Sequence, residues 1–143
     1  MTEISFHFNV PDRSAYACRL VRKASRLGSR IAVTGDAEML SRFDRELWAF
    51  DPVEFVPHVR VRAGEPVAER LLPTRVWLLE DASGIEHHDV LLNLGQVPPP
   101  GFESFARLIE IVSTAEEDRL GGRERWRHYA NRGYPIQRHE VAE

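Results

Sequence analysis

The segment IAVTGD, residues 31–36, decides the predicted fold class of this 143-residue chain. Its first four residues form a short apolar run without polar alternation, which is typical of a strand buried on both faces of a parallel sheet. Gly35 then predicts a turn, and Asp36 predicts the N-cap of a helix that runs to about residue 48. A buried strand followed at once by a helix indicates an α/β layer structure.

Strand and helix signals on both sides of this segment continue the alternation. Residues 4–10 alternate apolar and polar side chains and predict a strand that Pro11 and Asp12 end. Residues 14–27 carry apolar side chains at helical spacing and predict an amphipathic helix with Gly28 as its C-cap. Downstream, the pattern predicts strands at 76–79, 90–94 and 106–112, the last strand being followed by a last helix at 114–131.

Proline positions shape the middle of the chain. Residues 55–58 predict a short extended piece that Pro57 keeps out of a central strand, and residues 59–74 predict a loop. The whole pattern predicts a single domain over residues 1–143. Its expected fold is an α/β, Rossmann-like three-layer sandwich with a mostly parallel sheet and helices on both faces.

Composition and charge exclude several classes of protein. The chain is 43% hydrophobic and 29% charged, with a formal net charge of -3, which argues against a protein whose whole surface grips nucleic acid. Cys18 is the only cysteine, so no internal disulfide forms. The sequence shows neither a signal peptide near its start nor an apolar stretch of about 18 residues that crosses a membrane. These features predict a cytoplasmic protein.

The sequence offers little support for catalysis, a cofactor or a metal. The residues after the first strand, 11–14, contain no glycine, so the phosphate-binding loop of nucleotide enzymes is missing. The adjacent His87 and His88 have no cysteine at ligand spacing and indicate a solvated turn, while Cys18 reads as a small buried hydrophobe. Glu80-Asp81 is the only carboxylate pair at a predicted strand end. We therefore expect no catalytic residue, no cofactor and no bound metal.

Two segments have a composition that suggests binding. Residues 43–58 hold four large aromatic side chains beside Pro57, which is the composition either of core or of a partner interface. Residues 119–138 hold six arginines, and Arg123, Trp126, Arg127 and Tyr129 are spaced to share one helix face. Such a face binds an acidic peptide, stacks single-stranded DNA, or is simply a solvated surface.

The same two segments carry a resemblance to a known family. The matching motifs are Phe43-Asp44-x-x-Leu47-Trp48, Phe55-Val56-Pro57-His58, Ala63-Gly64-Glu65, and Arg123-Glu124-Arg125-Trp126-Arg127-x-Tyr129 with Gly133. With the apolar strands between them, they resemble the chi subunit of bacterial DNA polymerase III holoenzyme over nearly the full chain.

The resemblance implies a function without catalysis. Chi proteins have a Rossmann-like fold with no working nucleotide site and act in DNA replication as clamp loader accessory subunits, through protein–protein interactions. One surface holds the psi subunit, which links chi to the clamp loader, and another holds the acidic, Phe-ended C-terminal tail of single-stranded-DNA-binding protein (SSB). By position, the psi surface comprises Trp48, Phe55 and Pro57, and the SSB-tail site comprises Val112, Arg119, Arg123, Trp126 and Arg127.

One departure from the family pattern lies within the expected tail site. Gly121 and Gly122 stand where the family has helix-forming residues, and two glycines cost a helix about 2 kcal/mol relative to alanines. This pair predicts a looser or kinked helix. Two alternative functions also stay open: a small α/β enzyme or nucleotide-binding domain, and a direct single-stranded DNA binder whose affinity falls steeply with salt.

Overall fold

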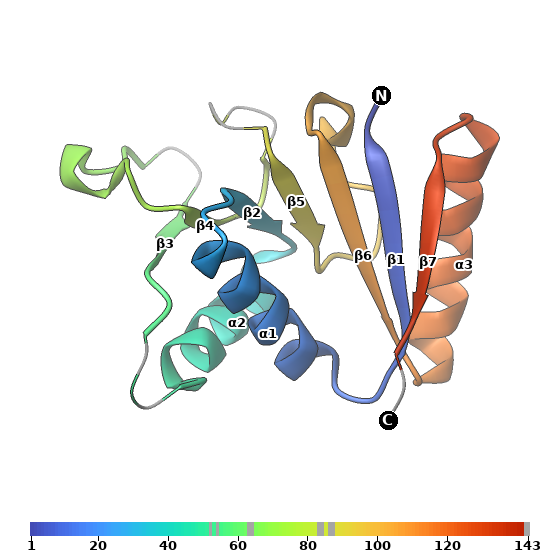
Figure 1. The fold of residues 1–143 in the computed structure, drawn as a ribbon, viewed down its shortest axis with the longest axis horizontal. Helices are drawn as coiled ribbons and strands as arrows, with labels where there is room; N and C mark the ends of the chain where they lie inside the picture. The colour runs from blue at the N-terminus through green and yellow to red at the C-terminus, as the bar shows by residue number, and fades with distance from the viewer. Residues whose placement is uncertain (52, 54, 63–64, 83–84, 86–87, 142–143) are drawn as a thin grey trace.

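The computed structural model describes residues 1–51, 53, 55–62, 65–82, 85 and 88–141. Within these residues the chain forms one seven-stranded sheet in the order β3-β4-β2-β5-β6-β1-β7 (Figure 1). The strands are β1 (Glu3–Val10), β2 (Ile31–Thr34), β3 (His58–Val61), β4 (Val76–Leu79), β5 (Val90–Asn93), β6 (Arg107–Ser113) and β7 (Ile136–Glu140). The helices are α1 (Arg13–Arg26), α2 (Ala37–Ala49) and α3 (Glu116–Asn131), with short 3-10 turns at Glu69–Leu71 and Phe102–Ser104.

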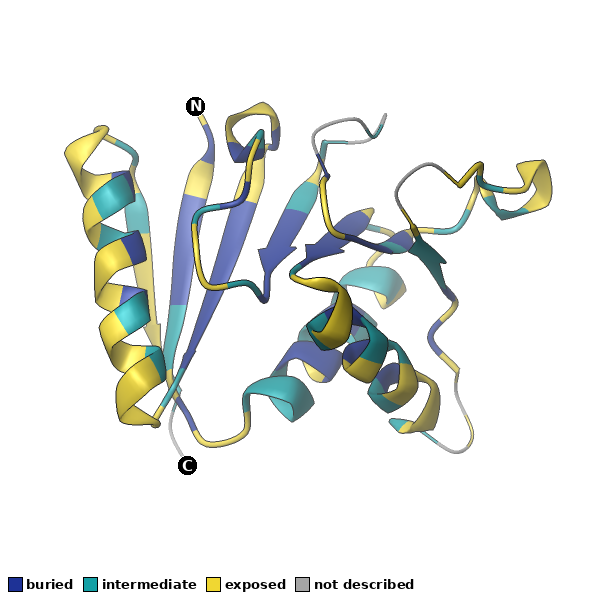
Figure 2. Cartoon of the chain, turned by 180° about the vertical axis from the view of Figure 1, so that it is seen from behind, coloured by how far each residue is buried: buried dark blue, intermediate teal, exposed yellow. Residues whose placement is uncertain are grey.

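Every strand pair within the described residues is parallel, so the predicted α/β fold with a mostly parallel sheet is confirmed. Helices α1 and α2 lie on one face of the sheet and α3 lies on the other (Figure 1). Because successive side chains of a strand point to opposite faces, Ile31 and Val33 pack with α1 and α2, whereas Ala32 joins the cluster on the α3 side. Figure 2 shows the central strands buried and the outer side of α3 exposed.

Asp36 begins a helix and Gly28 ends one as predicted, and Asp12, which was predicted only to end the first strand, also caps α1. Asp36 accepts a hydrogen bond from the backbone N–H of Met39 at 2.8 Å, and Asp12 accepts one from Ala15 at 3.1 Å. Gly28 has a φ of 81°, the left-handed conformation that ends a helix at low cost for glycine. The predicted helices and the strand at 31–34 are therefore confirmed, with boundaries within two residues.

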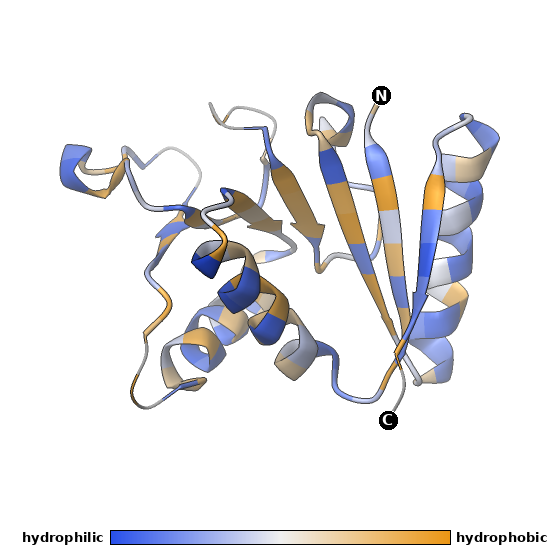
Figure 3. Ribbon diagram, in the orientation of Figure 1, coloured by the Kyte–Doolittle hydropathy of each residue, from blue (hydrophilic) through white to orange (hydrophobic). Residues whose placement is uncertain are grey.

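The two edge strands contradict the sequence prediction. Residues 59–61 were expected in a loop but belong to β3, which pairs with β4, and the strand at 106–112 was expected to be the last although β7 follows it. Pro57 lies just before β3, where its missing N–H costs nothing. Of the five residues of β7, Ile136 alone is apolar, and Figure 3 shows the rest of this strand as hydrophilic. An edge strand buries few side chains, so its backbone pairing leaves little trace in the apolar pattern.

The predicted kink at Gly121-Gly122 is wrong, because α3 runs without interruption from Glu116 to Asn131. A Cβ atom on Gly122 would lie 2.7 Å from Cγ2 and 3.1 Å from Cγ1 of Val112, a buried residue of β6. The glycine therefore lets α3 approach the sheet more closely than any other residue would allow.

We predict that Gly122→Ala lowers the free energy of unfolding by about 1–2 kcal/mol, although alanine favours a helix by about 1 kcal/mol over glycine. Rotation of Val112 does not relieve the clash, because both of its methyl groups are close to the new Cβ. Adding Val112→Ala should recover part of the loss, which urea unfolding of the single and double variants measures. A Gly122→Ala variant that is more stable than the wild type would contradict this close approach.

Candidate functional site

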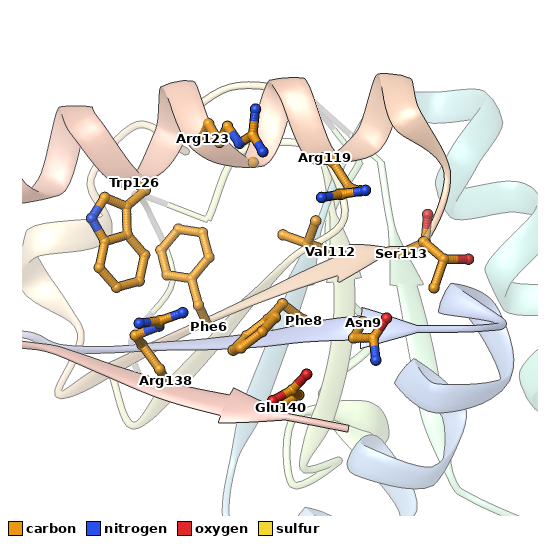
Figure 4. Close-up of a pocket in the computed structure, with 12 residues that line it drawn as sticks. Phe6, Phe8, Asn9, Val112, Ser113, Arg119, Arg123, Trp126, Arg138 and Glu140 are labelled. Atoms are coloured by element: carbon orange, nitrogen blue, oxygen red, sulfur yellow. The ribbon is translucent and has the colours of Figure 1, made fainter. Parts of the chain in front are cut away.

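A groove of about 640 Å³ lies between α3 and the strands β1, β6 and β7 (Figure 4). Helix α3 forms one wall and β7 forms the other, while side chains of β1 and β6 form an apolar floor. Its lining residues are Phe6, Phe8, Asn9, Val112, Ser113, Thr114, Arg119, Gly122, Arg123, Trp126, Arg138 and Glu140.

Simple periodicity brings these side chains together. Alternation along β1 turns Phe6 and Phe8 toward the α3 side of the sheet. On α3, residues three and four positions apart share a face, which turns Arg119, Arg123 and Trp126 toward the groove. The missing side chain at position 122, between them, leaves the groove open above Val112.

Aromatic rings and guanidinium groups meet at one end of the groove. The rings of Phe6 and Trp126 lie with centroids 5.1 Å apart. The guanidinium of Arg138 lies 5.2 Å from the ring centroid of Phe8 and 5.9 Å from that of Trp126. With Arg123 on the opposite wall, the groove combines an apolar surface with groups that pair with a carboxylate. This arrangement suits a peptide that presents both an acidic group and an aromatic or aliphatic side chain.

Four of the five residues expected in an SSB-tail site line this groove together: Val112, Arg119, Arg123 and Trp126. The fifth, Arg127, is exposed but does not line it. The expectation that Tyr129 shares a face with Arg123 is wrong, because Tyr129 is fully buried.

Sequence reasoning missed Phe6, Phe8, Arg138 and Glu140. The arginine cluster that ends at Arg138 was visible, but the pairing of β7 with β1, which brings Arg138 and Glu140 to the groove, was not.

A buried polar network fixes α3 beneath the groove. Arg125 donates from Nε to Oε1 of Glu110 at 2.9 Å, and the Tyr129 hydroxyl donates to Oε2 at 2.6 Å. Asn93, at the end of β5, donates to the same Oε2 at 3.0 Å. Burial raises the pKa of Glu110, while Arg125, Tyr129 and Asn93 act in the opposite direction by stabilising its charge. Because Arg125 and Tyr129 point into the sheet, Arg123 and Trp126 are held on the groove side of the helix.

We predict that Arg125→Met lowers the free energy of unfolding by about 3–5 kcal/mol, because it leaves the carboxylate of Glu110 buried without its cation. Arg127→Met is the matched control. It makes the same change two residues along α3 at an exposed position, and a shift within about 0.5 kcal/mol is expected. Urea unfolding measures both, and equal effects would mean that the Glu110–Arg125 pair does not anchor the helix.

The aromatic segment at 43–58 divides between core and surface. Phe43 and Val56 are buried, whereas Trp48 is 49% exposed and Phe55 is 64% exposed. The Trp48 and Phe55 rings meet edge to face with centroids 6.4 Å apart, and Pro57 beside them is also exposed. The expected set of Trp48, Phe55 and Pro57 therefore lies together on the surface, next to the edge strand β3.

His58 packs against Trp48, one of the residues of this aromatic surface. Its ring lies 4.3 Å from the Trp48 ring by centroid distance. Nε2 of His58 faces Oδ1 of Asp44 at 2.8 Å, and Nδ1 faces the carbonyl oxygen of Val56 at 2.7 Å. Both ring nitrogens thus contact oxygen acceptors, which orients the imidazole and limits the positions that Trp48 can take.

The remaining residues considered for chemistry are Cys18, the Glu80-Asp81 pair and the His87-His88 pair. Cys18 is buried as predicted, and burial raises the pKa of its thiol to about 12. Glu80 and Asp81 are exposed at the end of β4, and His87 lies outside the described residues. In the described part of the chain, no three His, Cys, Asp or Glu residues gather as metal ligands, and no helix is both long and apolar enough to cross a membrane.

Comparison with known proteins finds relatives over nearly the whole chain. The sequence model of the family described as DNA polymerase III chi subunit, HolC, matches residues 1–137. The chain belongs to the DNA polymerase III chi subunit family. It is 32% identical to the DNA polymerase III subunit chi of Pseudomonas aeruginosa, over 99% of this chain and 98% of that protein. It is 29% identical to the subunit chi of Haemophilus influenzae, over 87% of this chain and 85% of that protein.

Within this chi-family protein, the two surfaces lie at opposite edges of the sheet. The aromatic surface adjoins β3, and the groove adjoins β7, with five strands between these two (Figure 1). The two candidate surfaces therefore do not overlap.

Proposed function

We propose that this protein is a non-catalytic adaptor of the DNA polymerase III holoenzyme. In this proposal, the groove binds the acidic C-terminal tail of SSB, and the aromatic surface binds a psi subunit that links to the clamp loader. The observation that carries the proposal is the groove itself, because its arginines and aromatic floor complement an acidic peptide that ends in phenylalanine.

The chemistry of tail binding follows from the groove lining. The guanidinium of Arg123 holds the two oxygens of the terminal carboxylate in a bidentate pair. Trp126 covers the terminal phenylalanine ring, and Val112 with Phe6 supplies the apolar floor. Arg119 and Arg127 are exposed and attract acidic residues upstream in the tail, where solvent weakens each contact.

The proposed psi surface rests on exposed aromatic area. Two large rings that are half exposed and in contact with each other are typical anchors of a protein interface. The support from His58 and Asp44 holds Trp48 in place before binding, which lowers the entropy that association costs.

Direct binding of single-stranded DNA is the weaker alternative. The net charge of -3 opposes it, and the groove includes the carboxylate of Glu140, which repels phosphate groups. An acidic peptide also meets this carboxylate, but it presents fewer charges, and its terminal group can bind away from Glu140.

We predict that Arg123→Ala weakens binding of a labelled SSB-tail peptide by about 2 kcal/mol, because it removes a charge-assisted pair beside the apolar floor of the groove. Arg119→Ala should cost about 1 kcal/mol or less, and added salt should erode this smaller effect first. Titration of the peptide against both variants measures the difference. Equal losses in the two variants would mean that diffuse charge attraction, and not a specific site, binds the tail. Unchanged binding in both variants would mean that the tail does not bind in this groove.

We predict that Phe55→Ala weakens association with a psi-like subunit by about 2 kcal/mol or more, while the free energy of unfolding stays within about 0.5 kcal/mol. Leu120→Ala is the control, because Leu120 is also exposed but lies on α3 at the opposite edge of the sheet. Co-purification and calorimetry with the partner measure both variants. Undiminished binding by a folded Phe55→Ala variant would contradict the psi surface.

A further inference from the structure

The β7 wall of the groove carries two opposite charges. Arg138 pairs in register with Phe6 of β1, and Glu140 pairs with Phe8. Because residues two apart on a strand point to the same face, both side chains lie along the groove, facing α3 (Figure 4). Neither residue belongs to the motifs by which the sequence resembles its family.

Arg138 lies at the aromatic end of the groove. Its guanidinium is near the rings of Phe8 and Trp126, at 5.2 Å and 5.9 Å from their centroids, and these contacts limit its motion. Arg123 extends from α3 on the opposite wall. A carboxylate bound between these walls meets a cation on each side.

Glu140 lies two residues farther along β7, in the direction of Asn9 (Figure 4). It is the only acidic residue among the groove-lining residues that the structure describes. Its side chain is exposed and makes no hydrogen bond or ion pair with another described residue. Glu116 and Glu117, exposed in the first turn of α3, add negative charge at this end of the groove. Arg119 lines the α3 wall here, so a carboxylate on a ligand is attracted on the α3 side of the groove and repelled on the β7 side.

We propose that β7 sets the specificity of the groove among acidic peptides. Arg138 is a binding residue that holds the terminal carboxylate together with Arg123. Glu140 is a specificity-determining residue that disfavours acidic side chains against β7 near Asn9, so the acidic residues upstream in the tail lie on the α3 side, at Arg119. This inference rests on the proposed capture of a carboxy-terminal tail, and it adds the residues that orient the tail.

The test titrates three labelled peptides against the full-length protein. The first is an acidic peptide that ends in phenylalanine with a free carboxylate. The second is the same peptide with a C-terminal amide, and the third has its acidic side chains replaced by Asn and Gln. The variants are Arg138→Gln and Glu140→Gln, and thermal unfolding confirms that each is folded. Glu124→Gln on α3 and Arg132→Gln at its end are matched controls, because both residues are exposed and lie outside the groove.

Removal of the repelling charge should increase affinity. Glu140→Gln is expected to tighten the acidic peptide about two- to fivefold, and to change the neutralised peptide less. Glu124→Gln makes the same change in net charge and should have a smaller effect. An equal gain from Glu140→Gln and Glu124→Gln would show that net charge alone acts, and would overturn the role of Glu140.

Removal of the positive charge of Arg138 should lower the affinity only for a peptide with a free terminal carboxylate. Arg138→Gln is expected to weaken the free-acid peptide about fivefold or more and to leave the amide peptide nearly unchanged, whereas Arg132→Gln leaves both nearly unchanged. Equal losses for the two peptides would overturn the role of Arg138. Wild-type protein that binds no peptide would overturn the proposed function itself, whereas wild-type binding with no effect of either β7 variant would overturn this inference alone.

Discussion

The ion pair between Glu110 and Arg125 is the interaction on which the candidate site depends. Both side chains are almost completely buried, and Tyr129 and Asn93 complete the hydrogen bonding of the carboxylate. A buried charge without its partner costs several kcal/mol, so the helix that carries Arg125 has one rotational setting on the sheet. In that setting, Arg123 and Trp126 face the groove. The position of the exposed Arg123 therefore depends on the buried Arg125.

Close packing at Gly122 complements this electrostatic anchor. The glycine brings α3 against Val112, so Val112 becomes part of the groove floor. Helix propensity alone treats two adjacent glycines as a weakness. Here the close approach to the sheet compensates for that local cost, since α3 continues unbroken through both residues.

The order of the strands separates the two candidate surfaces. The edge strands β3 and β7 lie at opposite ends of the sheet, and the cores on its two faces make the sheet a single body between them (Figure 1). A rigid body with a candidate binding surface at each end fits the proposed adaptor, because binding at one surface would not deform the other.

The sequence by itself determined the alternation of strands and helices, the parallel sheet and the two candidate binding segments. Buried strands such as 31–34 show in the sequence because both faces require apolar side chains, and capping residues such as Asp36 act on neighbouring backbone groups. The family resemblance rested on motifs in those same segments. Only the tertiary structure decided that Trp48 and Phe55 are exposed while Phe43 lies in the core. It also decided that Arg127 and Tyr129 do not line the groove. Only the tertiary structure also brought Arg138 and Glu140 beside Phe6 and Phe8. The reason is that β7 joins the sheet by backbone pairing with β1, a strand more than 120 residues earlier in the chain. Such pairing depends little on the side-chain pattern, so the sequence does not reveal it.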